Sequence, residues 1–289
     1  MNDAPAAAGT PGGWQSPDPP PAPPRRGLTG RLAGGLRLAW RLPVMALVVF
    51  GGLALLLALR LVERPLCGLR RPVTPFITQG VCCVVLAVLG LRLRARGQPM
   101  RGRGAMVANH VGWVDIFVLN ALQRVYFVAK SEVAGWPGIG WLARATGTVF
   151  INRNARDARL QKEIFEARLR AGHHLCFFPE GTSTDGLRVL PFKPTLFAAF
   201  FTAGLADILH VQPVSLVYTA PPGADPRHYG WWGEMAFFPH LLATAAAPGG
   251  GAVQVIFHPP VTPAQAGDRK ALARACEDAV RAPFPPPSR

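Results

Sequence analysis

The apolar residues divide the chain into two parts. Two long apolar segments come first, at residues 42–59 and 73–91. From residue 105 onward, short apolar runs alternate with longer amphipathic segments. The short runs predict strands near residues 105–108, 125–129, 148–151, 174–178, 211–218 and 253–258. Between them, residues 157–171 have the spacing of an amphipathic helix that stops at Gly172, and residues 193–209 and 264–282 also favour helices. This alternation predicts an α/β fold, a mostly parallel sheet flanked by helices.

Each of the two N-terminal apolar segments approaches the length needed to cross a bilayer. Arginines lie before, between and after them, so two crossings would carry the middle arginines to the far side of the membrane. A pair of helices that dips into one leaflet keeps every arginine at the cytoplasmic surface. We therefore favour a two-helix membrane-docking element over the alternatives, which are one or two true spans and a pair of buried core helices.

Composition shifts predict four regions. Residues 1–26 are rich in Pro, Ala and Gly and are expected to be a disordered tail. Residues 27–98 form the basic two-helix segment, residues 99–282 the α/β domain, and residues 283–289 a loose C-terminal tail.

The positive charge is concentrated in the first third of the chain. Residues 1–103 hold 14 arginines against three acidic residues, whereas residues 104–289 hold 17 basic against 13 acidic residues. Basic charge around apolar segments indicates anionic lipid head groups as partners. Nucleic acid is excluded because these arginines lack interleaved exposed aromatic residues. The five cysteines have no metal-ligand spacing, so we expect reduced packing residues and no metal site.

A candidate catalytic pair follows the first predicted strand. His110 is followed five residues later by Asp115, and a carboxylate can orient an imidazole that acts as a general base. Side chains five apart in one helix diverge by roughly 140°, so His110 should lie in the strand-to-helix turn and Asp115 in the first helical turn. A second motif, Phe-Pro-Glu-Gly-Thr at residues 178–182, follows a later strand. Sites in α/β proteins form at such strand ends.

Four sequence blocks, at residues 109–115, 147–153, 178–182 and 211–214, together resemble the PlsC-type glycerolipid acyltransferase family. The resemblance covers more than a third of the chain and extends to the two-helix element. It implies that His110 deprotonates a lysolipid hydroxyl, which attacks an acyl thioester directly, and that Asp115 orients His110. It also implies that Glu180, Gly181 and Thr182 shape the acceptor site, where backbone N–H groups steady the oxyanion.

Two positions depart from the family pattern. Asn152 replaces an acidic residue before Arg153, and Ser183 stands where an arginine usually follows the threonine. Loss of that arginine weakens the case for a phosphomonoester acceptor, although Lys130, Arg153 and Lys193 remain as cations for an anionic group. The longer string at residues 177–193, with residues 222–226 and 229–233, is similar to the bacterial lyso-ornithine lipid O-acyltransferase branch, whose acceptor carries no phosphate.

The expectation is therefore a lipid O-acyltransferase at the inner membrane with its catalytic domain on the cytoplasmic face. The resemblance implies acyl-acyl carrier protein or acyl-CoA as donor, membrane lipids and acyl carrier protein as partners, and no cofactor. Three alternatives stay open: a 1-acyl-sn-glycerol-3-phosphate acyltransferase that makes phosphatidic acid, a lipid hydrolase, and a non-catalytic lipid-binding membrane protein. The hydrolase is disfavoured because the chain has no Gly-x-Ser-x-Gly motif.

Overall fold

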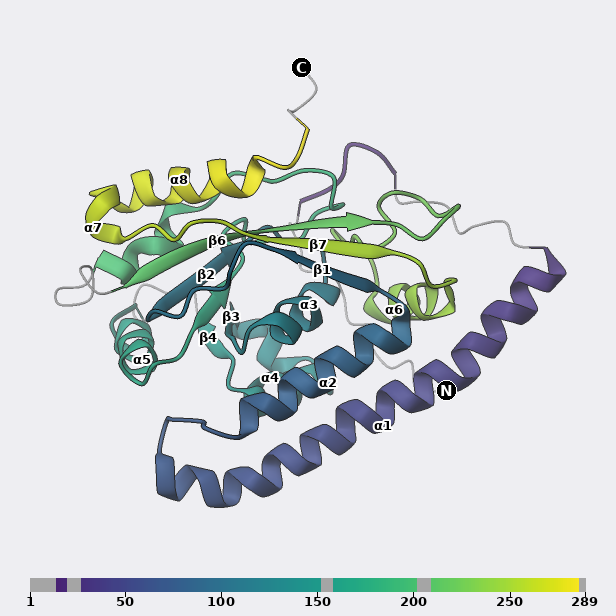
Figure 1. Ribbon diagram of the computed structural model, residues 1–289, viewed down its shortest axis with the longest axis horizontal. Coiled ribbons are helices and arrows are strands. Elements are labelled where there is room, and N and C mark those ends of the chain that lie inside the picture. Colours follow the sequence, from purple (N-terminus) through teal and green to yellow (C-terminus); the bar gives the residue numbers. More distant parts are fainter. Residues whose placement is uncertain (1–13, 20–26, 152–157, 202–208, 286–289) are drawn as a thin grey trace.

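The computed structural model describes residues 14–19, 27–151, 158–201 and 209–285. Its strands are β1 (Arg92–Arg96), β2 (Gly104–Ala108), β3 (Tyr126–Lys130), β4 (Val149–Ile151), β5 (Leu175–Phe177), β6 (His210–Thr219) and β7 (Ala252–Phe257). They form one seven-stranded sheet in the order β1-β7-β6-β2-β5-β3-β4 (Figure 1). Strands β2 to β6 run parallel to one another, β7 pairs antiparallel with β6, and β1 pairs parallel with β7. The predicted mostly parallel sheet is confirmed.

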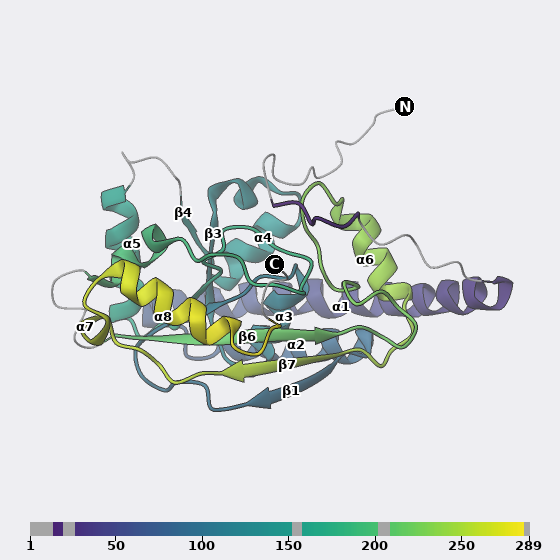
Figure 2. The same cartoon turned by 90° about the horizontal axis from the view of Figure 1, so that it is seen from above.

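Helices cover both faces of the sheet. They are α1 (Leu28–Cys67), α2 (Thr74–Leu89), α3 (Val114–Leu122), α4 (Ile139–Thr146), α5 (Ala158–Arg170), α6 (Phe237–Ala246), α7 (Pro263–Ala266) and α8 (Arg269–Arg281), with short 3-10 helices η1 (Ser131–Gly135) and η3 (Pro194–Phe201). In Figure 1, α8 lies above the sheet, whereas α3, α2 and then α1 lie below it. Figure 2 shows the same arrangement from above.

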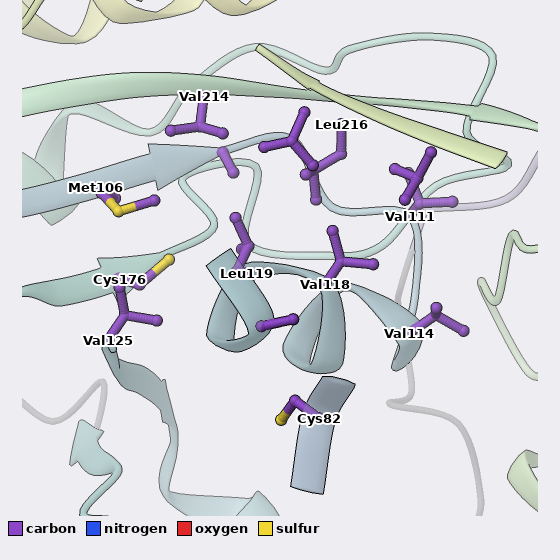
Figure 3. Close-up of a cluster of buried hydrophobic side chains, with 14 of the residues drawn as sticks. Cys82, Met106, Val111, Val114, Val118, Leu119, Val125, Cys176, Val214 and Leu216 are labelled. Carbon is purple, nitrogen blue, oxygen red and sulfur yellow. The ribbon is translucent and has the colours of Figure 1, made fainter. Parts of the chain in front are cut away.

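Strand β2 is covered by apolar side chains on both faces, which explains why the sheet lies at the centre of the fold. Every residue of β2 is buried, and alternate side chains point to opposite faces. Met106 and Ala108 join a core cluster with α2 and α3, drawn in Figure 3, whereas Ala105 and Val107 join a second cluster with α5, η3 and α8. A strand covered on both faces needs no polar alternation, so it was recognisable as a continuous apolar run.

Helix α1 is 40 residues long, which corresponds to about 60 Å. One side packs on α2 and α6 through a third cluster that contains Met45, Val85 and Leu89. The opposite side exposes a stripe of large apolar residues: Leu28, Leu32, Leu36, Trp40, Leu47, Phe50, Leu55, Leu61 and Leu66. By length and composition, α1 is the one helix in the described part of the chain that could cross a membrane.

Two sets of contacts tie α1 to the rest of the protein. The Arg41 guanidinium is buried and donates to the carbonyls of Ala245 (2.9 Å) and Ala247 (2.7 Å) at the end of α6. Near the C-terminal end of α1, the Glu63 carboxylate accepts the backbone N–H groups of Val73 (2.8 Å) and Thr74 (3.1 Å), where α2 begins. Helices α1 and α2 therefore form one packed unit.

The structure changes the predicted region boundaries in two places. Strand β1 belongs to the sheet although it lies inside the segment assigned to the two-helix element, residues 27–98. Residues 14–19, assigned to a disordered tail, pack on the domain: the Ser16 hydroxyl donates to Asp185 (3.0 Å), and Arg227 donates to the Pro19 carbonyl (2.8 Å). Residues 1–13, 20–26 and 286–289 lie outside the described residues, while Phe284 of the predicted C-terminal tail packs against the core.

Two predicted helices also differ in detail. The stretch 264–282 is two helices, α7 and α8, because Gly267 adopts a left-handed φ of 82° and Asp268 then caps α8 through the N–H groups of Lys270 and Ala271. The stretch 193–209 contains the 3-10 helix η3, and its residues 202–208 lie outside the described part.

Candidate active site

The turn between β2 and α3 carries His110, and the first turn of α3 carries Asp115. The imidazole Nδ1 lies 2.7 Å from Asp115 Oδ2, which also accepts the backbone N–H groups of Val111 (2.7 Å) and Gly112 (3.0 Å). The Asp115 side chain is fully buried, whereas the imidazole is 21% exposed. Asp115 therefore holds the proton on Nδ1 and leaves the Nε2 lone pair to accept a proton. This is the placement that the spacing predicted.

Tyr218 completes the arrangement and was not found from the sequence. Its hydroxyl, at the end of β6, donates to Asp115 Oδ1 at 2.7 Å. Burial and the neighbouring Asp115 carboxylate raise the pKa of Tyr218 well above its ordinary value, so it remains a donor. The sequence offered no clear signal for Tyr218, because the same strand also contains Gln212, Ser215 and Thr219.

The exposed part of His110 faces a cavity of about 270 Å³. Phe178, directly after β5, stacks on the imidazole with ring centroids 3.9 Å apart and an interplanar angle of 11°. In the described part of the chain, no hydrogen bond occupies Nε2. The rest of the lining includes Trp113, Ile116, Phe127, Lys130, Trp136, Gly181, Thr182, Ser183, Trp231, Trp232 and Phe237.

Glu180 lies behind this cavity. It is 2% exposed, and its two carboxyl oxygens accept the backbone N–H groups of His110 and Leu190, each at 2.8 Å. Burial raises the pKa of Glu180 to about 8, against the opposing effect of these hydrogen bonds. Glu180 thus supports the backbone of the catalytic turn instead of reaching into the cavity.

Gly181 and its neighbours form one wall. Gly181 has a left-handed φ of 73°, which favours glycine, and the Lys193 side chain lies against it. The Ser183 hydroxyl donates to the Trp231 carbonyl, which ties this wall to the opposite one. The Thr184 N–H donates to the His110 carbonyl at 2.8 Å, so the loop also braces the catalytic turn.

One of the three candidate cations lines the cavity, and a second lies beside a lining residue. Lys130, at the end of β3, lines it, and the exposed Lys193 lies next to Gly181. Arg153 lies outside the described residues. Within the described residues, no group of three or more histidine, cysteine or acidic side chains could hold a metal ion. All five cysteines are free.

A second cavity of about 270 Å³ adjoins the first. Both are lined by Trp113, Ile116 and Phe127. The second cavity continues between α1, α2 and α4, where its walls include Leu56, Val81 and Leu142. Together they make an apolar space that begins at His110 and extends toward the two N-terminal helices, which suits a chain of methylene groups.

Comparisons with known proteins agree with this chemistry. Residues 92–217 match the family model described as Acyltransferase. The chain is 58% identical to a lyso-ornithine lipid O-acyltransferase of Rhodobacter capsulatus over 93% of its own length and 95% of that protein. It is 40% identical to a protein of the same name from Brucella abortus, over 69% of this chain and 78% of that one.

A crystal structure of the 1-acyl-sn-glycerophosphate (LPA) acyltransferase PlsC from Thermotoga maritima shares the fold. The TM-score is 0.62 at 21% identity, with 88% of this chain and 95% of that chain covered. At this identity the likeness concerns the fold alone.

The chain belongs to the PlsC-type acyltransferase family. It is an acyltransferase of lipid biosynthesis, and its long apolar helix α1, together with these relatives, indicates that it associates with membranes.

Proposed function

We propose that the protein transfers a fatty acyl group from a thioester to the hydroxyl of lyso-ornithine lipid. The observation that carries this proposal is the His110–Asp115 pair beside two adjoining apolar cavities. The donor is acyl-acyl carrier protein or acyl-CoA, and no cofactor takes part.

In the proposed mechanism His110 acts as general base. Its Nε2 takes the proton of the acceptor hydroxyl while that oxygen attacks the thioester carbonyl. The C–O bond forms, the tetrahedral intermediate collapses with cleavage of the C–S bond, and the imidazolium returns the proton to the departing thiolate. Asp115 stabilises the imidazolium and, with Tyr218 as positioning residue, keeps the ring in one orientation.

Backbone amides supply the oxyanion contact in this proposal. The Gly181 N–H already donates to the Phe178 carbonyl (3.0 Å), which leaves the next amide of the turn, that of Thr182, for the developing oxyanion. Glu180 holds the turn from behind, and its role is thus to shape the site through the backbone.

Ser183 supports a phosphate-free acceptor. The bidentate donor suited to a phosphomonoester is missing at this position, and the serine hydroxyl is bound to Trp231. Lys130 and Lys193 are sufficient partners for the single carboxylate of an ornithine head group. They would also attract a phosphate, so a 1-acyl-sn-glycerol-3-phosphate acyltransferase is the second candidate.

We propose that the protein docks in the plane of the inner membrane, with the catalytic domain on the cytoplasmic side. The contacts of helix α1 with the domain support this arrangement. Arg41 fastens α1 to α6, and Arg71 in the α1–α2 turn donates to the Ala145 carbonyl of α4 at 2.7 Å. A spanning α1 would place one of these contacts across the bilayer. The exposed apolar stripe of α1 instead faces the lipid along its whole length.

The acceptor assignment is tested by giving the purified protein both lysolipids with each donor. We expect a higher kcat/KM for lyso-ornithine lipid, and no product with either acceptor from the His110→Ala variant. A higher kcat/KM for lysophosphatidate would reject the acceptor while leaving the enzyme class intact. Lipid extracts of a host that lacks ornithine lipid, analysed by mass spectrometry after complementation, check the result in cells.

A further inference from the structure

A third concave region, separate from the two cavities, lies at the edge of the sheet where the parallel strands begin. His110 lies at the opposite edge. Its volume is about 850 Å³, and its walls come from residues 98–101 before β2, 122–126 at the start of β3, 171–174 before β5, and the turn between α1 and α2. Parallel strands begin at one edge and end at the other, so the five residues of β2 separate this cleft from the catalytic turn by roughly 15 Å. The cleft is therefore distinct from the active site.

The lining of the cleft is strongly basic. It contains Arg70, Arg71, Arg101 and Arg124, and no aspartate or glutamate among its described lining residues. The Arg71 guanidinium donates to a carbonyl, and that of Arg124 lies 4.1 Å from the Phe76 ring centroid. Arg70 and Arg101 are exposed, and their side chains form no ion pair with the described residues. Two guanidinium groups are thus available to an anionic ligand.

Positive groups near the cleft also act on one another, with Glu63 as the opposing negative charge at Arg71. Burial, with the nearby charge of Arg60, lowers the pKa of Arg71 to about 10. Burial and the charge of Arg168 lower the pKa of His173 to about 4. Helices α3 and α5 end at this edge, but each contributes only about half a negative charge, against four arginines. A bound anion would relieve this repulsion.

The cleft also borders the apolar surface assigned to the membrane. The α1–α2 turn forms part of its rim, and Leu69, Val73 and Phe76 there are each about half exposed. When α1 lies in the membrane plane, these side chains enter the lipid and the arginines stand at the depth of the phosphate groups.

We propose that this arginine cleft binds the phosphate head group of an anionic membrane phospholipid, at a site separate from the acceptor site. The inference rests on the in-plane docking described under the proposed function. Acyl carrier protein is the less suitable occupant, because the cleft is rimmed by apolar side chains and lies across the sheet from His110.

Vesicle flotation of the full-length protein tests the cleft. The vesicles contain phosphatidylcholine alone or phosphatidylcholine with an equal part of phosphatidylglycerol. The cleft variant is R70A/R101A, and the matched control R269A/R274A removes two exposed arginines from α8, on the other face of the sheet (Figure 1). We expect wild type and control to bind the anionic vesicles more tightly than the neutral ones. The cleft variant should lose on the order of tenfold of that preference while keeping its binding to neutral vesicles.

Three results would overturn the proposal. An equal loss in both double variants would show that diffuse charge, not the cleft, attracts the vesicles. Unchanged preference for anionic vesicles, with loss of thermal stabilisation by glycerol phosphate in the cleft variant, would assign the cleft to a soluble phosphate. Unchanged vesicle binding with loss of acyl carrier protein binding would assign it to the carrier. Acyl transfer to detergent-dispersed lysolipid, measured on the same preparations, separates failure of this site from failure of the proposed function.

Discussion

Asp115 accepts hydrogen bonds from four groups: the His110 imidazole, the backbone N–H groups of Val111 and Gly112, and the Tyr218 hydroxyl. Two of these donors belong to the same turn as His110, so the carboxylate fixes the backbone and the imidazole together. The Tyr218 contact is different, because it comes from a strand more than a hundred residues away. It can therefore be removed without altering the turn itself.

Tyr218→Phe should lower kcat about tenfold with little change in KM, since removing a donor to a buried charged group costs on the order of 1–2 kcal/mol. The Asp115 carboxylate loses a stabilising donor and holds the imidazole less firmly. Because this contact orients the base and does not touch the substrate, the loss should fall on kcat. Steady-state kinetics measure kcat and KM separately.

Tyr229→Phe is the matched control for this prediction. The Tyr229 ring lies 5.3 Å from that of Tyr218, centroid to centroid, and Tyr229 does not contact Asp115. Removal of its hydroxyl should leave kcat unchanged. If both variants lower kcat alike, Tyr218 is only a packing residue.

The free energy of unfolding should depend on pH through the titration of Glu180. Because burial raises the pKa of Glu180 to about 8 from 4.5, the native protein holds a proton that the unfolded chain has released. The free energy of unfolding should therefore fall as the pH rises from about 4.5 to about 8. Glu180→Gln cannot titrate, so the Tm advantage of wild type over this variant should shrink across that window. A difference in Tm that stays constant or widens with pH contradicts the assignment.

The sequence could predict His110 and Asp115 because their contact is local, formed within one turn and the first residues of α3. Tyr218 could not be predicted, since its contact exists only because β6 lies beside β2 with Val214 opposite Ala108. Likewise, the backbone role of Glu180 depends on β5 lying on the other side of β2. Long-range strand order, and not residue chemistry, decides these contacts.

At the scale of elements, the buried strands were predictable and the edge strand β1 was not. Its sequence, Arg-Leu-Arg-Ala-Arg, looks like the charged flank of an apolar helix, and four of its five residues are exposed. It becomes a strand because its backbone pairs with β7, which runs parallel to it. Edge strands with few buried side chains leave little apolar pattern in the sequence.

Helix α2 separates two surfaces whose roles can be tested independently. Val81 lines the second cavity and packs against Gly52 of α1, whereas Val84, three residues on, is exposed on the outer side. Val81→Phe should fill part of the space and shift the preferred acyl donor to a shorter chain. Competition assays with donors of mixed chain length report this shift.

Val84→Phe adds the same bulk to the same helix outside the cavity. It should leave the chain-length preference unchanged, and overpacking at either site should cost no more than about 3 kcal/mol. An unchanged preference in the Val81 variant would show that the acyl chain does not occupy the second cavity.

At the scale of the whole molecule, most of α1 lies along the domain, and its N-terminal end extends beyond α6 (Figures 1 and 2). Single cysteines in place of Thr29 and Arg64, both exposed and near opposite ends of α1, should therefore react with an impermeant maleimide from the cytoplasmic side alone. The background must lack the five native cysteines, and Ala275→Cys on α8 marks the side on which the catalytic domain lies. Labelling of the two ends from opposite sides would show that α1 spans the membrane.

The catalytic turn, the apolar cavities and the arginine cleft occupy different parts of the molecule. The catalytic turn lies at the carboxyl ends of the central strands, the apolar cavities lead from it toward α1 and α2, and the arginine cleft occupies the opposite strand edge. The cleft shares no lining residue with the two cavities, so a defect in the cleft should leave acyl transfer measurable.

Replacement of His110 tests the central claim most directly. The measurement compares acyl transfer to lyso-ornithine lipid by wild type, His110→Ala and Asp115→Asn, with vesicle binding recorded for each. If His110 is the general base, His110→Ala should lose at least a hundredfold in kcat, Asp115→Asn should lose less, and all three should bind vesicles equally. Near-wild-type transfer by His110→Ala with intact binding would contradict the account.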